Sequence, residues 1–262
     1  MQIIDFHCHI YPVAVAQKAA QSICEFYELE GGHMDGTVET LLRQGNAAGI
    51  DRFVVLPVGM RPDKVRHVND FILAEAAKEP RFIGFGTVHA GMEDIAGEAE
   101  YIIRAGLHGI KMHPDFQKFD IDDPRLFPLY ETVQGRMPVM YHMGDKRYDY
   151  SHPAKLRRVM ELFPKLQTVA AHFGGYSMYE TAYEILHDKE NSIFDVSSSL
   201  MFMPEGVAEK YINAFGAERM VFGTDYPLWD PVVETKRFFS LKLTDEQFER
   251  IAHKTAEEFL EL

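Results

Sequence analysis

Short apolar segments alternate with amphipathic segments along the whole chain of 262 residues. The apolar segments are rich in β-branched residues and nearly continuously apolar, as expected of parallel strands that are buried on both faces. We predict strands at residues 3–10, 52–58, 82–89, 109–113, 138–143, 167–173, 192–199 and 220–225. The pattern therefore indicates an α/β protein with a parallel sheet.

Segments with helical periodicity separate these strands. The clearest one begins at Thr37, a typical N-cap residue, and ends at Gly49, a typical residue after a helix C-terminus. The last predicted helix runs from Thr244 to Leu260 and carries Gln247 at the capping-box position. The remaining predicted helices span residues 69–78, 93–105, 124–134, 153–162, 179–187 and 207–215.

The number and order of these elements match a (β/α)8 TIM barrel, and a doubly wound open sheet is the structural alternative. The long segment at residues 11–36 predicts an inserted helix after the first strand, over the mouth of the barrel. The sequence contains no linker-like stretch or internal repeat. We therefore expect residues 1–262 to form a single barrel domain.

The first predicted strand carries two histidines on one face. Because side chains alternate along a strand, Asp5, His7 and His9 point to one side and Phe6 and Cys8 to the other. Two imidazoles on alternate residues can reach one metal ion. The motif alone is a weak signal in a chain with 12 histidines.

Later predicted strands end on residues of the same chemical kind. The fourth ends with Lys111 and His113, the fifth with His142, the sixth with His172 and the eighth with Asp225. A glycine or proline follows each of these ends within a few residues. Since barrel enzymes keep their active sites at the C-terminal ends of the strands, the pattern predicts one shared site.

Two motifs near the ends of the chain point to a known family. The sequence D-x-H-x-H at residues 5–9, together with G-T-D-Y-P at residues 223–227, resembles the amidohydrolase superfamily. The resemblance covers the whole chain. It is strongest to the amidohydrolase-related branch, which includes the aminocarboxymuconate semialdehyde decarboxylase-like proteins.

The resemblance implies a metal site and a proton-transfer residue. It implies that His7, His9, His142 and Asp225 bind one divalent metal ion. It also implies that His172 polarises the substrate or handles a proton beside metal-bound water. Imidazole and carboxylate ligands suit Zn²⁺, and Mn²⁺ or Fe²⁺ would also fit.

The predicted ligands support a catalytic role in addition to metal binding. Zn²⁺ lowers the pKa of bound water to about 7, so hydroxide forms at neutral pH. We expect Asp225 to accept and return that proton while His172 stabilises developing negative charge. Asp5 is expected to orient a ligand histidine.

Lys111 allows two interpretations. In binuclear members of the superfamily, a lysine on the fourth strand is carboxylated and bridges two metal ions. The resembled branch works with one metal, which favours an ammonium that binds a substrate carboxylate. We also predict substrate-binding roles for His113, Arg61 and Trp229.

Charge and composition exclude several classes of function. The formal net charge is −13 and the sequence has no basic stripe, which argues against nucleic acid as a partner. TatD-type nucleases have glutamates where this chain has Lys111 and Gly223. The absence of a long apolar run argues against a membrane span, and the N-terminal sequence does not look like a secretory signal.

We therefore expect a cytoplasmic enzyme with an anionic small-molecule substrate, and a homodimer is compatible with the sequence. Hydrolysis of an amide, ester or lactone through metal-bound water is the first functional hypothesis. Non-oxidative decarboxylation of a small carboxylic acid is the alternative, and a non-catalytic metal-binding barrel is a more distant one. The apparent fold does not separate these hypotheses, because the function depends on the site.

Overall fold

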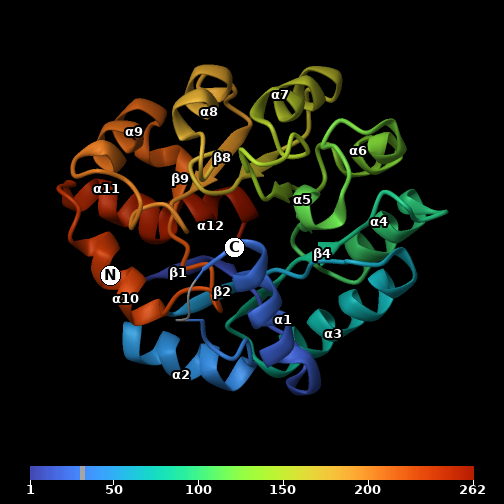
Figure 1. Cartoon of the computed structure of the whole chain (residues 1–262), viewed down its shortest axis with the longest axis horizontal. Coiled ribbons are helices and arrows are strands. Elements are labelled where there is room, and N and C mark those ends of the chain that lie inside the picture. The colour runs from blue at the N-terminus through green and yellow to red at the C-terminus, as the bar shows by residue number, and fades with distance from the viewer. Residues whose placement is uncertain (30–32) are drawn as a thin grey trace. The chain divides into compact units, whose positions relative to one another are not determined.

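The computed structural model describes residues 1–29 and 33–262, which divide into two compact units. The first unit contains residues 1–56 and 196–262, and the second contains residues 57–195. Figure 1 shows the order of the helices and strands along the chain. No helix in the described ranges is long and apolar enough to cross a membrane.

Strand β1 (Ile4–Cys8) forms the centre of the first unit. It pairs in parallel with β2 (Arg52–Val55), and all five of its residues are buried. On its other side lies the chain that continues β9 (Met220–Val221), where the Asp225 N–H donates to the His7 carbonyl at 2.8 Å. Because β1 has neighbours on both sides, its backbone is held by hydrogen bonds from two directions.

The helices of the first unit follow from local sequence signals. The hydroxyl of Thr37 accepts a hydrogen bond from the Thr40 N–H, and Gly49 ends the helix with φ +74°. Thr244 and Gln247 form the predicted capping box. The helical segments are α1 (Val13–Phe26), α2 (Val38–Ala48), α9 (Val207–Phe215), the 3-10 turn Ala217–Arg219, α10 (Pro231–Phe239), α11 (Asp245–Glu249), the π-helical segment Arg250–Lys254 and α12 (Thr255–Leu260).

The second unit is a run of parallel strands joined by helices. Its strands are β3 (Phe82–Gly84), β4 (Gly86–Thr87), β5 (Ile110–Met112), β6 (Val139–Tyr141), β7 (Thr168–Ala170) and β8 (Ser192–Asp195). Neighbours from β4 to β8 pair in chain order, which requires a crossover connection between each pair. Figure 1 shows α4, α6, α7 and α8 following one another along these strands.

The crossover helices of this unit begin with recognisable caps. Asp94 accepts from the Gly97 N–H at the start of α4, and α7 has proline at its first position. The helical segments are the 3-10 turn Pro62–Lys64, α3 (Val65–Lys78), α4 (Ile95–Arg104), α5 (Pro114–Gln117), the 3-10 turn Pro124–Leu126, α6 (Phe127–Val133), α7 (Pro153–Leu162) and α8 (Tyr179–Leu186).

Strand register determines which residues share an edge. Met112 on β5 is opposite Tyr141 on β6, and Tyr141 is opposite Ala170 on β7. Ala170 is in turn opposite Phe194 on β8. The residues that come directly after these positions therefore emerge at one edge of the second unit.

Every predicted strand contains a strand in the structure, although each is shorter than predicted. The third predicted strand is interrupted at Phe85 and forms β3 and β4. The predicted insertion after the first strand contains α1, and residues 30–32 of that insertion lie outside the described residues. Helix α10 was not among the predicted helices, although Asp230 caps it and Pro231 occupies its first position.

Candidate metal centre

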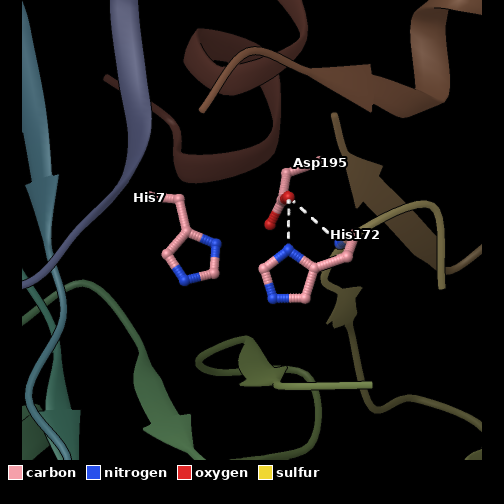
Figure 2. Close-up of side chains that lie close together, drawn as sticks. All are labelled: His7, His172 and Asp195. Carbon is pink, nitrogen blue, oxygen red and sulfur yellow. Dashed lines mark hydrogen bonds and ion pairs between the residues drawn. The ribbon is translucent and has the colours of Figure 1, made fainter. Parts of the chain in front are cut away.

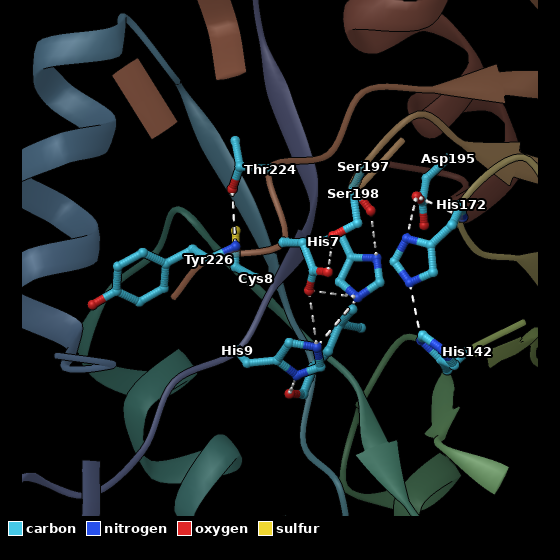
Figure 3. A network of polar contacts seen from close by, with 12 residues as sticks. His7, Cys8, His9, His142, His172, Asp195, Ser197, Ser198, Thr224 and Tyr226 are labelled. Atoms are coloured by element: carbon cyan, nitrogen blue, oxygen red, sulfur yellow. Dashed lines mark hydrogen bonds and ion pairs between the residues drawn. The ribbon is translucent and has the colours of Figure 1, made fainter. Parts of the chain in front are cut away.

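Three potential ligand atoms converge in the first unit. Nε2 of His7 lies 3.2 Å from Nε2 of His9. Oδ1 of Asp225 lies 3.4 Å from His7 Nε2 and 3.6 Å from His9 Nε2. Figure 3 shows the two imidazoles together with their polar partners. These three residues are among the groups whose geometry could hold a metal ion.

The spacing of these atoms fits a divalent cation. A tetrahedral site with metal–ligand distances of about 2.1 Å separates its ligand atoms by about 3.4 Å. The three separations in the first unit, from 3.2 to 3.6 Å, are close to that value. Both histidines are buried, so few competing water molecules reach their ring nitrogens. The donor set therefore fits a metal ion without rearrangement of the side chains.

Hydrogen bonds orient the two imidazoles. Nδ1 of His9 lies 2.7 Å from the Leu56 carbonyl oxygen, which can only accept a hydrogen bond. His9 therefore carries its proton on Nδ1, and its Nε2, which lies beside Nε2 of His7, offers a lone pair. Nδ1 of His7 lies 3.1 Å from the hydroxyl oxygen of Ser197. Such contacts between the distal nitrogen of a histidine and an oxygen are common in metal sites.

Asp5 connects β1 to the residues before Asp225. Its Oδ1 accepts from the backbone N–H groups of His7 and Thr224, and its Oδ2 accepts from the Thr224 hydroxyl at 2.6 Å. Complete burial raises the pKa of Asp5 to about 6, although hydrogen bonds from Thr224 act in the opposite direction. Asp5 thus holds the backbone of His7, whereas the sequence analysis expected it to orient an imidazole.

Gly223 allows β1 and the chain after β9 to approach closely. A Cβ atom at this position would lie only 2.8 Å from the Cβ atom of His7. Asp225, two residues later, has φ +59°, in the left-handed region that residues other than glycine rarely adopt. Backbone conformations of this kind are concentrated at functional sites. The small size of Gly223 and the left-handed backbone of Asp225 together bring the Asp225 carboxylate to His7 and His9.

The other carboxylate oxygen of Asp225 is also engaged. The Ser198 hydroxyl donates a hydrogen bond to Oδ2 of Asp225. The indole Nε1–H of Trp229 donates to the Ser198 hydroxyl oxygen at 2.8 Å. Trp229 also contacts the ring of Phe202, which is exposed, with 5.9 Å between the ring centroids. The expected substrate contact of Trp229 stays a prediction.

The second unit places two histidines and a carboxylate in a row. Nε2 of His172 lies 3.0 Å from Nδ1 of His142. On its other side, Nδ1 of His172 lies 3.7 Å from Oδ1 of Asp195, which also accepts the His172 backbone N–H at 3.0 Å. Figure 2 shows the His172 imidazole facing this carboxylate. All three side chains are buried, so their interactions are little screened by water.

His113 and Asp115 lie beside His142 in the second unit. The ring of His113 stacks on that of His142, with 4.0 Å between the centroids. Nδ1 of His113 accepts from the Phe116 N–H, so the neutral ring carries its proton on Nε2 and can donate from there. Asp115 Oδ2 lies 4.0 Å from Nε2 of His142, and burial raises the pKa of Asp115 to about 7.

The other predicted site residues have contrasting environments. The side chain of Lys111 is completely buried on β5. The Arg61 side chain is 68% exposed, and its guanidinium donates two hydrogen bonds to Asp63. A substrate carboxylate would therefore have to compete with Asp63 for Arg61. The substrate-binding roles of Lys111 and Arg61 stay predictions.

Sequence reasoning missed several residues that contact the predicted ones. These are Asp115, Asp195, Ser197 and Ser198. Residues 195–199 read Asp-Val-Ser-Ser-Ser and follow an apolar run, so they resemble the other strand ends that the sequence analysis selected. That signal was available, but a serine alone does not indicate metal chemistry.

A comparison with protein families decides how this site is classified. The amidohydrolase family model matches residues 4–262. The chain belongs to the amidohydrolase family. This assignment confirms the resemblance inferred from the two terminal motifs. It also identifies the protein as a metal-dependent enzyme of the hydrolase or carboxy-lyase type.

Solved structures confirm the fold of this amidohydrolase-family chain. An uncharacterised TIM-barrel protein from Bordetella bronchiseptica is 23% identical, with a TM-score of 0.84 over 100% of this chain and 99% of that one. A dihydroxybenzoic acid decarboxylase from Polaromonas sp. JS666, solved with manganese and the inhibitor 2-nitroresorcinol, is 16% identical, with a TM-score of 0.76 over 100% and 97%. The 5-carboxyvanillate decarboxylase from Sphingomonas paucimobilis is 15% identical, with a TM-score of 0.73 over 100% and 99%. The fold is therefore the predicted TIM barrel, and the doubly wound alternative is excluded.

Proposed function

We propose that this amidohydrolase-family enzyme is a metal-dependent, non-oxidative decarboxylase of a small aromatic carboxylic acid. The observation that carries the proposal is the convergence of His7, His9 and Asp225 with a spacing that fits a metal ion. Decarboxylases among the solved structures of the same fold support this reading over the hydrolase reading. The substrates named for those relatives support an anionic aromatic substrate.

The proposed metal ligands are His7, His9, Asp225 and His142. The first three are supported by their mutual geometry, and His142 by its position directly after β6. Their imidazole and carboxylate groups accommodate either Zn²⁺ or Mn²⁺. We propose that Mn²⁺ also supports activity, because the decarboxylase from Polaromonas was solved with manganese. A bound divalent cation would supply positive charge to substrate oxygens and so stabilise negative charge that develops during the reaction.

Decarboxylation requires a proton at the carbon that loses the carboxylate. The carbon–carbon bond breaks, its electron pair stays on the ring carbon, CO₂ leaves, and one proton replaces it. We assign proton donation to His172. The Asp195 carboxylate beside Nδ1 stabilises the protonated imidazole before transfer. After transfer, the imidazole is neutral and takes up a proton from solvent for the next turnover.

Substrate binding is assigned to groups that suit an anion. The Nε2–H of His113 is a hydrogen-bond donor because Nδ1 of the same ring already accepts from the Phe116 N–H. Lys111, buried on β5, supplies positive charge as an ammonium. Two such groups would hold a carboxylate or a phenolate oxygen and fix the ring for proton transfer.

Hydrolysis of an amide, ester or lactone is the second candidate. A site with two histidines and an aspartate also suits the activation of water by a metal ion. In that reaction Asp225 would accept the proton of the water and His172 would stabilise the negative charge on the substrate. The same residues thus serve both reactions, and the substrate distinguishes them.

One assay separates the two reactions. The purified enzyme, supplied with Mn²⁺ or Zn²⁺, is incubated with hydroxybenzoic acids and with the matching amides, esters and lactones. We expect CO₂ release from a hydroxybenzoic acid. The release should stop when a chelator is added and should fall by about 10²–10⁴-fold in His172→Asn. Hydrolysis without CO₂ release would favour the second candidate and overturn the decarboxylase proposal.

A further inference from the structure

We propose that Trp229 and Ser198 form a hydrogen-bond relay that positions the Asp225 carboxylate as a metal ligand. Both residues act through Asp225, so they are positioning residues. The inference rests on the metal centre of the proposed function and adds to it the residues that fix one of its ligands. The proposal reassigns Trp229, for which the sequence suggested a substrate contact.

The chemistry of the three groups sets the direction of the relay. An indole N–H can only donate a hydrogen bond, and an ionised carboxylate can only accept one. The Trp229 Nε1–H lies 2.8 Å from the Ser198 hydroxyl oxygen, so that oxygen is the acceptor. The Ser198 hydrogen is then available for Oδ2 of Asp225, to which the hydroxyl donates. Both hydrogen bonds therefore point towards the carboxylate.

The backbone is specifically shaped for this contact. Ser198 has φ +49° and Asp225 has φ +59°, and both are non-glycine residues in the left-handed region. Such conformations cost free energy and persist where surrounding contacts impose them. Here they bring a side-chain hydroxyl and a carboxylate together from positions 27 residues apart. The backbone conformation of Ser198 thus places its hydroxyl beside the carboxylate of Asp225.

Two adjacent serines, Ser197 and Ser198, contact two different proposed metal ligands. The Ser197 hydroxyl lies 3.1 Å from Nδ1 of His7, and the Ser198 hydroxyl contacts Asp225. One short segment after β8 therefore touches two of the three residues whose ligand atoms converge. Ser199, the next residue, has a different partner and donates to the Ser197 carbonyl at 2.9 Å. This difference makes Ser199 a matched control.

The relay determines which oxygen of Asp225 can bind a metal ion. Oδ2 is occupied by Ser198, whereas Oδ1 lies 3.4 Å from Nε2 of His7 and 3.6 Å from Nε2 of His9. The carboxylate is therefore held so that a single oxygen faces the histidines. Hydrogen-bonding partners of metal ligands typically contribute 10–100-fold to metal affinity.

The sequence provides a spectroscopic probe of this relay. Trp229 is the single tryptophan in the chain, so tryptophan fluorescence reports on this indole alone. Zn²⁺ has a filled d shell and no redox chemistry. A change of Trp229 emission on addition of Zn²⁺ would therefore report a change in the surroundings of the indole.

The test combines fluorescence with calorimetry. Zn²⁺ is titrated into chelator-treated wild-type protein and into the variants Ser198→Ala, Trp229→Phe and Ser199→Ala. We expect Zn²⁺ to shift the emission of the wild type. Ser198→Ala should raise the Kd for Zn²⁺ by about 10–100-fold and abolish the emission change. Trp229→Phe keeps an aromatic ring without the N–H, and should raise the Kd about tenfold. Ser199→Ala should match the wild type in both measurements.

The outcomes distinguish the relay from the metal centre. Wild-type Kd values in folded Ser198→Ala and Trp229→Phe proteins would overturn the relay while leaving the metal centre intact. Zn²⁺ binding by the wild type without any emission change would also contradict the relay. If Ser198→Ala does not fold, the Kd of Trp229→Phe decides. A wild-type protein that binds neither Zn²⁺ nor Mn²⁺ would overturn the proposed function itself.

Discussion

The Nε2 atoms of His7 and His9 lie 3.2 Å apart, and both side chains leave the chain at β1 or directly after it. This arrangement follows from the two-residue period of an extended chain, which turns alternate side chains to the same side. Oδ1 of Asp225, more than 200 residues later in the chain, completes a triangle with these two atoms. The local motif thus becomes a metal site only through a distant segment.

Replacement of His7 by alanine should abolish tight metal binding. The variant removes one of the four proposed ligands, and the three that remain are too few to hold the ion tightly. We expect His142→Ala to have the same effect, because His142 is the fourth proposed ligand. Elemental analysis of the purified proteins measures the result. His187→Ala, which changes an exposed histidine at the end of α8, should keep the wild-type metal content. Full occupancy in His7→Ala would contradict the proposed coordination.

Asp225→Asn should lose turnover and retain only part of the metal. An amide offers one accepting oxygen and one donating nitrogen, so it cannot both accept from Ser198 and face His7 with an oxygen. We expect at least about a 100-fold loss of kcat, because a partly lost or misplaced metal ion no longer stabilises the negative charge that develops on the substrate. Metal titration and steady-state kinetics check both effects. Wild-type turnover in Asp225→Asn would show that the carboxylate is dispensable.

His172→Asn should lower kcat by about 10²–10⁴-fold, because general acid catalysis contributes on this scale. Asp195→Asn should lower it less, since it removes the charge beside His172 Nδ1 but leaves the imidazole in place. The pH dependence of kcat supplies the second measurement. The alkaline limb should shift to lower pH in Asp195→Asn, because a general acid acts in its protonated form and the amide no longer stabilises the imidazolium. A profile identical to the wild type would exclude a role for Asp195 in proton transfer.

Lys111→Met should raise KM at least tenfold and leave one metal ion per chain. Methionine fills a similar buried volume on β5 but has no positive charge to hold a substrate carboxylate. Steady-state kinetics and metal stoichiometry distinguish the two interpretations of this lysine. Loss of a second metal ion in the variant would favour a carboxylated lysine. Continuous density from the lysine Nζ to two metal peaks in a crystal structure would establish that alternative directly.

Asp115→Asn should raise the free energy of unfolding of the metal-depleted protein, relative to the wild type, more at pH 8 than at pH 4.5. Burial raises the pKa of Asp115 from 3.8 to about 7 in the folded state. Between about pH 4 and pH 7 this carboxyl group is ionised in the unfolded chain but stays protonated in the folded protein. The free energy of unfolding of the wild type therefore falls as pH rises through this range. A difference of about three units between the folded and unfolded pKa corresponds to on the order of 4 kcal/mol in the free energy of unfolding. The amide does not ionise, so the variant escapes this penalty.

Urea unfolding at the two pH values measures this effect. Asp123→Asn is the control of opposite sign, because hydrogen bonds from Arg125 lower the pKa of Asp123. Its replacement should cost stability at pH 8 and little at low pH. An Asp115→Asn protein with the same pH dependence as the wild type would show that this carboxyl group is not raised in the folded state.

The sequence by itself determined the features of this protein that depend on residues close together in the chain. Alternating apolar and amphipathic segments located every strand, and Thr37 and Thr244 marked two helix starts that the structure confirms. The sequence also indicated that His7 and His9 lie together, because alternate side chains of an extended strand point to the same side. Chemical type at strand ends identified Asp225 and the histidines of the second unit as candidates.

Only the tertiary structure decided how these candidates are oriented. The proton of His9 is placed by the Leu56 carbonyl, and the carboxylate of Asp225 by Ser198. The Asp195 carboxylate faces His172 because β7 and β8 pair in a particular register. Such contacts join residues that are distant in sequence, and a shift of one residue in register would turn each side chain to the opposite face. Local patterns do not encode that register, so the ligand types were readable from the sequence while their partners were not.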